Sequence, residues 1–118
     1  MSLAANAVIA LIGLLHVYIL VLEMFLWDKP AGRRAFGMTQ EMATATKTLA
    51  ANQGLYNGFL AAGLFWGLWL GDAGQPVKVF FLLCVLAAGI FGAATASRKI
   101  LFIQAVPAAI GLALVGLA

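Results

Sequence analysis

Residues 3–27 read LAANAVIALIGLLHVYILVLEMFLW, an almost unbroken apolar run that ends at the sequence Asp28-Lys29-Pro30. A helix needs about 20 mainly apolar residues to cross the hydrocarbon of a bilayer, and proline does not continue a helix. The stretch therefore predicts a membrane-spanning helix. Two ionisable side chains, His16 and Glu23, lie inside it. A charge at the centre of a spanning helix costs about 2.5 to 3.5 kcal/mol on insertion scales, so both side chains need a reason to be there.

Three more apolar runs follow, at 48–70, 77–96 and 100–118. Of the 118 residues, 64% are hydrophobic and 9% are charged, whereas a soluble domain has roughly 25% charged residues. A single helix over 77–118 would be about 60 Å long, twice the bilayer core, so a hairpin at Arg98-Lys99 is predicted instead. We predict an all-α polytopic membrane protein, a four-transmembrane-helix bundle that forms one domain over 1–118. Its expected helices are 3–27, 40–70, 77–96 and 100–118.

The segment 32–46 is the one connection long enough to be a substantial loop. Near its end, Thr39 is a residue that caps helix N-termini, and Glu41 would face the positive end of the helix dipole in the first turn. The second helix is therefore expected to begin outside the bilayer and to enter it near Lys47.

Lysine and arginine gather at two of the three predicted connections. The first and third connections contain six of them: Lys29, Arg33, Arg34, Lys47, Arg98 and Lys99. The second has Lys78 beside Asp72. By the positive-inside rule, the first and third connections face the cytoplasm and both termini face outward. No basic segment precedes the first apolar run, so no cleaved signal peptide is expected. The net charge of +3 offers no basic surface for nucleic acid.

The polar residues inside the predicted spans fall at matching depths. Counted from the cytoplasmic boundary, four of them lie at a similar level: Glu23, Asn52, Gln53 and Gln104. His16 and Asn57 lie closer to the midplane. His16 and Glu23 share one helix face because they are seven residues apart, and Gln53 and Asn57 share another because they are four apart. We therefore predict a polar seam between the first two helices, with Gln104 closing its cytoplasmic end.

The seam is open to more than one interpretation. Hydrogen bonds between spanning helices are a common packing device, worth about 0.6 kcal/mol each. Glu23 and His16 are candidate catalytic residues for general acid–base chemistry on an amphiphilic substrate. A metal site is disfavoured, because seven residues separate His16 from Glu23 by about 10.5 Å along the axis and the chain has one His and one Cys. We expect neither a metal nor a cofactor.

The second predicted helix also carries small and aromatic residues in a pattern. Gly54 and Gly58 lie on one side, and Gly63 and Gly67 on another. Glycines at four-residue spacing let helix backbones approach closely, so both faces are predicted helix contacts. Tryptophans mark the expected membrane boundaries at Trp27, Trp66 and Trp69.

Three segments together resemble a known family. They are LHVYILVLEMFLW at 15–27, GRRAFG at 32–37 and LAANQGLYNGFLAAG at 49–63. With them the chain resembles, over nearly its whole length, the DUF1304 family of small bacterial membrane proteins of unknown function. The resemblance implies four membrane helices in a bacterial inner (plasma) membrane and no defined activity. It places the family's hallmark residues on the predicted seam, at His16, Glu23, Asn52, Gln53, Tyr56 and Asn57.

The leading hypothesis is a pocket that binds an amphipathic small molecule, such as a lipid, a quinone or an isoprenoid. Its predicted ligand-binding residues are His16, Glu23, Asn52, Gln53, Tyr56, Asn57 and Gln104. Three other classes stay open: an isomerase-like intramembrane enzyme acting on such a molecule, a small proton or solute transporter formed by a homo-oligomer, and a purely structural partner-binding protein. The bilayer itself is an expected partner in every case.

Overall fold

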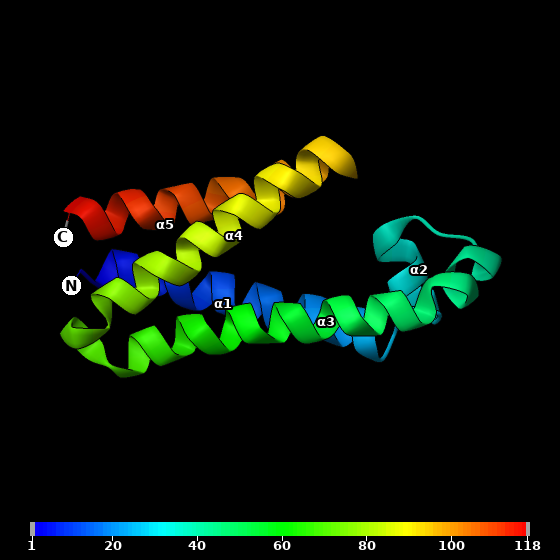
Figure 1. Ribbon diagram of the computed structural model, residues 1–118, viewed down its shortest axis with the longest axis horizontal. Helices are drawn as coiled ribbons and strands as arrows, with labels where there is room; N and C mark the ends of the chain where they lie inside the picture. Colours follow the sequence, from blue (N-terminus) through cyan, green and yellow to red (C-terminus); the bar gives the residue numbers. More distant parts are fainter. Residues whose placement is uncertain (1, 118) are drawn as a thin grey trace. The chain divides into compact units, whose positions relative to one another are not determined.

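The computed structural model describes residues 2–117, and all regular structure in that range is helical. Five α-helices follow one another: α1 (Leu3–Met24), α2 (Pro30–Phe36), α3 (Gln40–Trp69), α4 (Gln75–Thr95) and α5 (Val106–Leu117) (Figure 1). A 3-10 turn (Gly71–Gly74) connects α3 to α4, and a π turn (Leu101–Ala105) precedes α5. The predicted all-α class is confirmed.

The chain divides into two compact units. Unit 1 consists of residues 1–14 and 60–118, and unit 2 of residues 15–59. Helices α1 and α3 therefore contribute to both units, whereas α4 and α5 belong to unit 1 and α2 belongs to unit 2.

Between α1 and α3 the chain differs from the sequence prediction in two ways. Helix α1 ends at Met24, three residues before the predicted end, and a turn occupies the residues up to α2. Helix α2 occupies the beginning of the segment 32–46 that was predicted as a loop, whereas the predicted helix start at residue 40 is confirmed by α3. The local reason is the placement of two residues. Pro30 pre-organises the first turn of α2, and Gly37 ends it with φ +63°, a left-handed conformation that glycine adopts without strain.

The start of α3 agrees with prediction. The backbone N–H of Met42 donates to Oγ1 of Thr39 at 3.2 Å, so Thr39 caps the helix. Glu41 lies in the first turn, where its charge favours the helix dipole. Helix α3 therefore begins well before the polar residues of its middle section.

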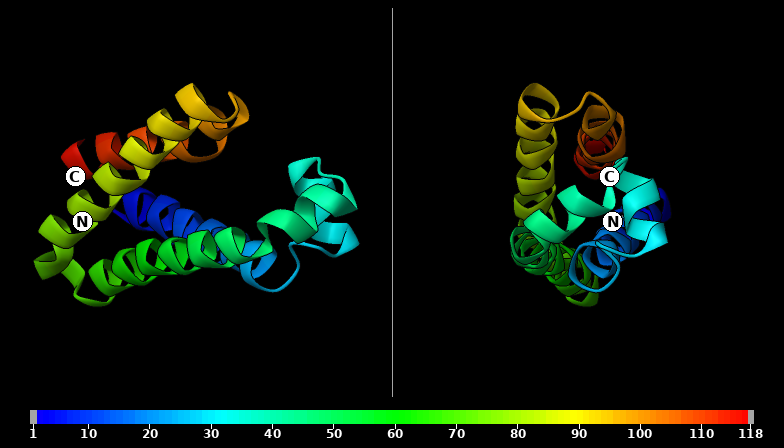
Figure 2. Two further views of the ribbon diagram at one scale, coloured as in Figure 1. Left: turned by 45° about the vertical axis from the view of Figure 1, so that its right-hand side comes forward. Right: turned by 90° about the vertical axis from the view of Figure 1, so that its right-hand side faces the viewer.

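Unit 1 is built around the α4–α5 pair, which lies side by side in both views of Figure 2. The predicted hairpin at Arg98-Lys99 is confirmed, because α4 ends at Thr95 and the π turn follows. The predicted helix 100–118 is divided, however. Pro107 in the first turn of α5 lacks a backbone N–H, and the preceding turn widens to π geometry. Residue 118 lies outside the described range.

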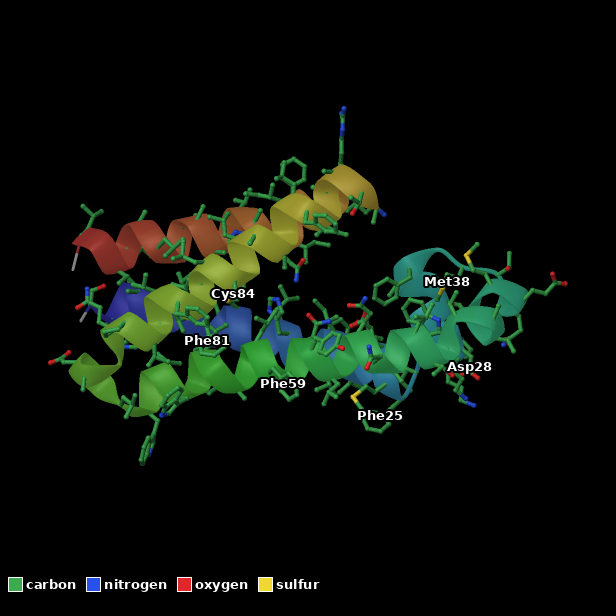
Figure 3. The ribbon with its side chains drawn as sticks, viewed as in Figure 1. Phe25, Asp28, Met38, Phe59, Phe81 and Cys84 are labelled. Carbon is green, nitrogen blue, oxygen red and sulfur yellow. The ribbon has the colours of Figure 1, made fainter. Side chains whose placement is uncertain are left out.

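The apolar core of unit 1 combines side chains from α1, α3, α4 and α5. Its buried members are Ala5, Ile9, Ile12, Leu64, Leu82, Val85, Ala108 and Val115. Cys84 on α4 is half-buried (Figure 3) and is the only cysteine of the sequence, so the chain forms no internal disulfide.

Two helical stretches are long and apolar enough to cross a bilayer: Leu3–Met24 with 22 residues and Gly71–Thr95 with 25. A shorter apolar stretch covers Leu101–Leu117. Helix α3 is longer than either, with 30 residues, but it is not among them. Its amides and charged residues lower its hydropathy, and several of those amides are residues of the predicted seam.

Candidate functional site

Glu23 of α1 and Asn57 of α3 form the centre of the candidate site in unit 2. The Asn57 side-chain Nδ2 donates a hydrogen bond to the Glu23 carboxyl across 34 residues of sequence. The same Nδ2 lies 3.2 Å from the backbone oxygen of Gln53, its acceptor one turn earlier in α3. Both Glu23 and Asn57 are half-buried. This hydrogen bond joins α1 to α3 and connects two residues of the predicted seam.

A glycine lets the two helices meet at this level. A Cβ added to Gly54 would lie 2.5 Å from Cγ of Met24 and 3.2 Å from Cβ of Glu23. One turn further along α3, a Cβ on Gly58 would lie 2.7 Å from Cδ1 of Leu20. The predicted helix contact at Gly54 and Gly58 is confirmed, and it brings the α3 backbone next to Glu23 of α1.

A second polar pair lies on the exposed side of α3. Asn52 donates to the Tyr56 hydroxyl at 3.1 Å, and both side chains are exposed. The Tyr56 ring lies 6.3 Å from the ring of Phe59, which is also exposed. Polar groups and aromatic surface are thus adjacent on one helix.

The depth prediction needs correction for His16 and Asn57. They were expected at one level, yet Asn57 binds Glu23, which lies seven residues beyond His16. The reason is the turn after α1. The backbone N–H groups of Phe25 and Leu26 donate to the oxygen of Val21, and that of Lys29 donates to the oxygen of Leu26. A count of helical residues from Trp27 therefore does not give the level at which Glu23 meets α3.

The remaining predicted residues are His16 and Gln104. His16 is completely buried in α1. Gln104 is half-buried in the π turn of unit 1, in the other compact unit. Its role in closing the seam therefore stays a prediction.

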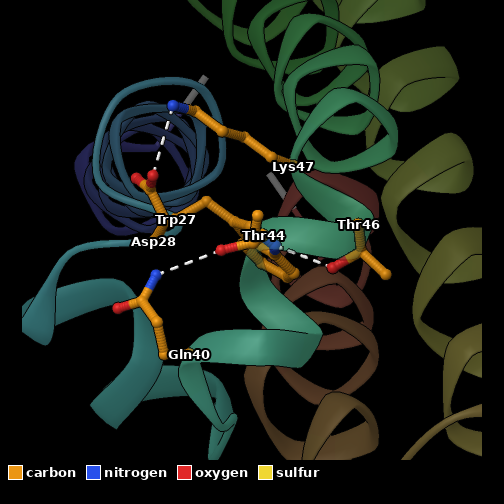
Figure 4. A network of polar contacts seen from close by, with 6 residues as sticks. All are labelled: Trp27, Asp28, Gln40, Thr44, Thr46 and Lys47. Atoms are coloured by element: carbon orange, nitrogen blue, oxygen red, sulfur yellow. Dashed lines mark hydrogen bonds and ion pairs between the residues drawn. The ribbon is translucent and has the colours of Figure 1, made fainter.

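Where α1, α2 and α3 meet, a polar cluster surrounds Trp27 (Figure 4). The indole N–H of Trp27 donates to Oγ1 of Thr46 at 3.0 Å, and its ring lies 4.8 Å from that of Phe36 in α2. Lys47 and Asp28 form an ion pair at 3.2 Å. The sequence identified Trp27 only as a boundary anchor and missed Asp28. The available signal was an acid beside an aromatic residue at a helix end.

The ion pair makes unit 2 sensitive to acid. The hydrogen bond from Lys47 lowers the pKa of Asp28 below its ordinary value of 3.8. A carboxyl with a lowered folded-state pKa stabilises the fold above its unfolded pKa, and that stabilisation is lost as the pH falls through the folded pKa. We expect Asp28→Asn to lower the melting temperature at neutral pH. The difference from the natural chain should shrink as the pH falls through the lowered folded-state pKa of Asp28, because the carboxyl then becomes neutral.

Thermal unfolding followed by circular dichroism across acidic pH measures this. Glu41→Asn is the matched control, since Glu41 is exposed and has no ion pair among residues 2–117. A gap between Asp28→Asn and the natural chain that stays constant down to the lowest pH would contradict the assignment.

Comparison with known proteins identifies the family. The family model described as "Protein of unknown function (DUF1304)" matches residues 10–116. The chain belongs to the DUF1304 family. This DUF1304 protein is also 29% identical over 96 residues to "Uncharacterized protein YpaA" of Lactococcus lactis subsp. lactis (strain IL1403), covering 80% of the present chain and 81% of the relative. No solved structure matches it.

The DUF1304 protein also has a buried lysine that the sequence presented only as a topology charge. Lys78 of α4 is completely buried, and its Nζ donates to Oδ1 of Asn6 at 3.1 Å and to the backbone oxygen of Gly71 at 3.4 Å. Gly67 leaves room for it, because a Cβ there would lie 2.7 Å from Cγ of Lys78. Lys78 thus ties α1, the end of α3 and α4 together in unit 1.

Two other features bear on ligand chemistry in the DUF1304 protein. Among residues 2–117, no three His, Cys, Asp or Glu side chains come close enough together to hold a metal ion. A shallow, mostly apolar cavity of about 490 Å³ lies along α4 and contains no predicted site residue; it is lined by Gln75, Pro76, Val79, Phe80 and Leu83.

Proposed function

We propose that this DUF1304 protein is a four-span integral membrane protein whose Glu23–Asn57 pair binds the polar end of an amphipathic small molecule. The observation that carries the proposal is the hydrogen bond from Asn57 to the Glu23 carboxyl, made inside an apolar helix. A carboxyl is costly to place in a spanning helix, and such residues usually belong to a ligand or ion pathway. The proposal gives this carboxyl a use.

The chemistry of the pair suits a ligand with both donor and acceptor atoms. A carboxyl accepts two or more hydrogen bonds, and one amide N–H from Asn57 leaves acceptor positions for a ligand hydroxyl. The Asn57 side-chain oxygen is a second acceptor on the same site. Headgroups of lipids, reduced quinones and isoprenoid alcohols offer such donors.

The exposed side of α3 supports the apolar half of the proposal. Tyr56 is 51% exposed and Phe59 is 57% exposed, and Asn52 binds the Tyr56 hydroxyl. In a bilayer, exposed amides face hydrocarbon unless something covers them, at a cost of several kcal/mol for each unsatisfied group, about the scale of a lost hydrogen bond. A bound molecule with a polar end and an apolar body would cover Asn52 and lie on the two rings.

Two further features support a four-span arrangement. Trp66 and Trp69 are exposed near the end of α3, at 52% and 81%, which suits side chains at a membrane boundary. The α4–α5 hairpin places the basic pair Arg98-Lys99 at its turn. By the positive-inside rule this turn would face the cytoplasm, together with α2, and both termini would face outward.

Native mass spectrometry of the gently extracted protein tests the binding proposal. We expect the natural chain to carry a small molecule of defined mass, and Glu23→Gln to carry about tenfold less. The reason is that a buried polar group left without its hydrogen-bond partner costs about 1 to 3 kcal/mol, and about 1.4 kcal/mol corresponds to a tenfold change in affinity. Glu41→Gln is the matched control, because it removes an exposed acid of α3 outside the site and should retain the molecule.

Circular dichroism confirms that each variant is folded before the masses are compared. Equal retention in all three folded proteins, or bare protein in all three, would overturn the proposal. A retained molecule that is converted chemically, with a pH optimum that moves in Glu23→Gln, would make the site an isomerase-like enzyme instead. Ion flux in liposomes that Glu23→Gln abolishes would make it a transporter.

A further inference from the structure

A basic surface lies on α2 at the end of unit 2, separate from the Glu23–Asn57 pair. It consists of Lys29, Arg33 and Arg34, and we refer to it as the α2 basic surface. Lys29 and Arg34 are exposed, and Arg33 is half-buried. Lys29 precedes the first residue of α2, and the two arginines occupy its last turn. Three cations are therefore presented within six residues of sequence.

Among residues 2–117 these three cations have no ion-pair partner, and the one charge interaction that they make joins Lys29 to Asp28. Asp28, the neighbouring acid, pairs with Lys47 at 3.2 Å. Moreover, Nε of Arg33 is buried and has no hydrogen-bond partner in that range. An unmet charged donor is unfavourable, so an anion brought to these side chains would gain both hydrogen bonds and charge compensation.

The surface is held in place by packing. The Phe36 ring contacts Trp27, which in turn donates to Thr46 of α3. Gly32 of α2 fits against the turn after α1 so closely that a Cβ there would lie 2.1 Å from the backbone oxygen of Leu26. Gly37 then ends the helix, and the N–H of Met38 donates to the oxygen of Arg33 at 2.9 Å. The guanidinium groups therefore project from a fixed helix and not from a free loop.

An exposed aromatic side chain lies on the same short helix as the two arginines. Phe36, the last residue of α2, is 42% exposed. Exposed aromatic residues beside cations are typical of helices that lie in the headgroup region of a bilayer, where the rings enter the apolar boundary and the cations meet phosphate. This pairing favours a lipid phosphate over a dissolved one.

We propose that the α2 basic surface binds the phosphate of an anionic phospholipid such as phosphatidylglycerol. Arg33 and Arg34 donate to the phosphate oxygens, and Lys29 adds a point charge. The proposal rests on the membrane location proposed above, but not on the Glu23–Asn57 site, which it leaves free for another molecule. It gives α2 a function that the positive-inside rule alone does not require.

The experiment compares two pairs of adjacent cations in the whole protein. One variant is Arg33→Gln with Arg34→Gln, and the matched control is Arg98→Gln with Lys99→Gln in the α4–α5 turn, where both residues are exposed. Detergent-solubilised protein is mixed with equal amounts of phosphatidylglycerol and phosphatidylcholine, and the lipids retained are counted by native mass spectrometry. We expect a preference for phosphatidylglycerol in the natural chain and the control, and a preference about tenfold weaker in the α2 variant.

Several outcomes would overturn the proposal. If both double variants lose the preference for phosphatidylglycerol equally, the preference depends on the total charge of the protein and not on the α2 basic surface. If neither variant loses it, the α2 basic surface does not cause the preference. Inorganic phosphate alone provides another arm: if it raises the melting temperature as much as phosphatidylglycerol does, the surface binds free phosphate and not lipid. Glu23→Gln is expected to keep the full preference for phosphatidylglycerol, so failure of the small-molecule site and failure of this surface are distinguishable.

Discussion

Gly89→Ala is expected to lower the melting temperature by about 8 °C, a loss of roughly 2 kcal/mol for a chain of this size. The cause is the close approach of α4 to the π turn before α5. A Cβ at position 89 would lie 2.5 Å from the backbone nitrogen of Ala105 and 2.9 Å from its Cα and Cβ. Backbone cannot rotate away as a flexible side chain does, so the helices must separate. Overpacking of this kind costs about 1 to 3 kcal/mol, which exceeds the roughly 1 kcal/mol that alanine gains in a helix.

Gly116→Ala is the matched control within unit 1. It makes the same chemical change in α5, but among residues 2–117 no atom beyond its chain neighbours and the helix's own backbone lies within 4 Å of the added Cβ. We expect its melting temperature to equal or slightly exceed that of the natural chain. Thermal unfolding by circular dichroism in detergent compares the two variants. If the Gly89→Ala and Gly116→Ala variants have the same melting temperature, the tight contact between α4 and the π turn is contradicted.

Gly54→Val is expected to disrupt unit 2 and the candidate site together. The added Cβ would lie 2.5 Å from Cγ of Met24 and 3.3 Å from the backbone oxygen of Leu20, and valine adds two methyl groups beyond it. Separation of α1 from α3 would stretch the hydrogen bond between Asn57 and Glu23. We therefore expect a destabilisation of about 3 kcal/mol and complete loss of the retained small molecule.

Gly58→Ala provides the comparison for this prediction. Its Cβ would meet only Cδ1 of Leu20, at 2.7 Å, and that methyl group is the end of a flexible side chain. We expect a change in stability of less than about 1 kcal/mol, because the rotation of Leu20 and the gain in helix propensity offset each other. Melting temperature and retained mass are measured on both variants.

These measurements also separate packing from binding. Under the proposed function, Glu23→Gln keeps a nearly natural melting temperature and loses the small molecule, whereas Gly54→Val loses both. If the protein only holds partners together, the glycine substitutions would impair it and Glu23→Gln would have no effect. A Gly54→Val variant that stays as stable as Gly58→Ala and keeps its ligand would contradict the close α1–α3 contact.

The sequence predicted residues of the candidate site, but not the level at which α1 and α3 meet. Helical periodicity placed Glu23 and Asn57 on faces that could meet, and a hydrogen bond joins them. The predicted level was wrong, because His16 was placed opposite Asn57 whereas Asn57 contacts Glu23, seven residues further along. That level depends on the turn after α1, on its packing with α2 and on the Asp28–Lys47 ion pair, which the linear pattern does not contain.

Local chemistry in the sequence determined the helical class, the Thr39 cap, the hairpin at Arg98-Lys99 and the glycine contact at Gly54, since each depends on neighbouring residues or on a periodicity that survives in any packing. The tertiary structure alone decided the existence of α2, the burial of Lys78 and the partner of Asn57. A seven-residue helix is unstable by itself and forms because Trp27 and Gly32 pack it against the turn. Lys78 is buried because Asn6, 72 residues away in sequence, meets its ammonium group. Contacts between distant segments fix such features, and a linear pattern of residues does not contain them.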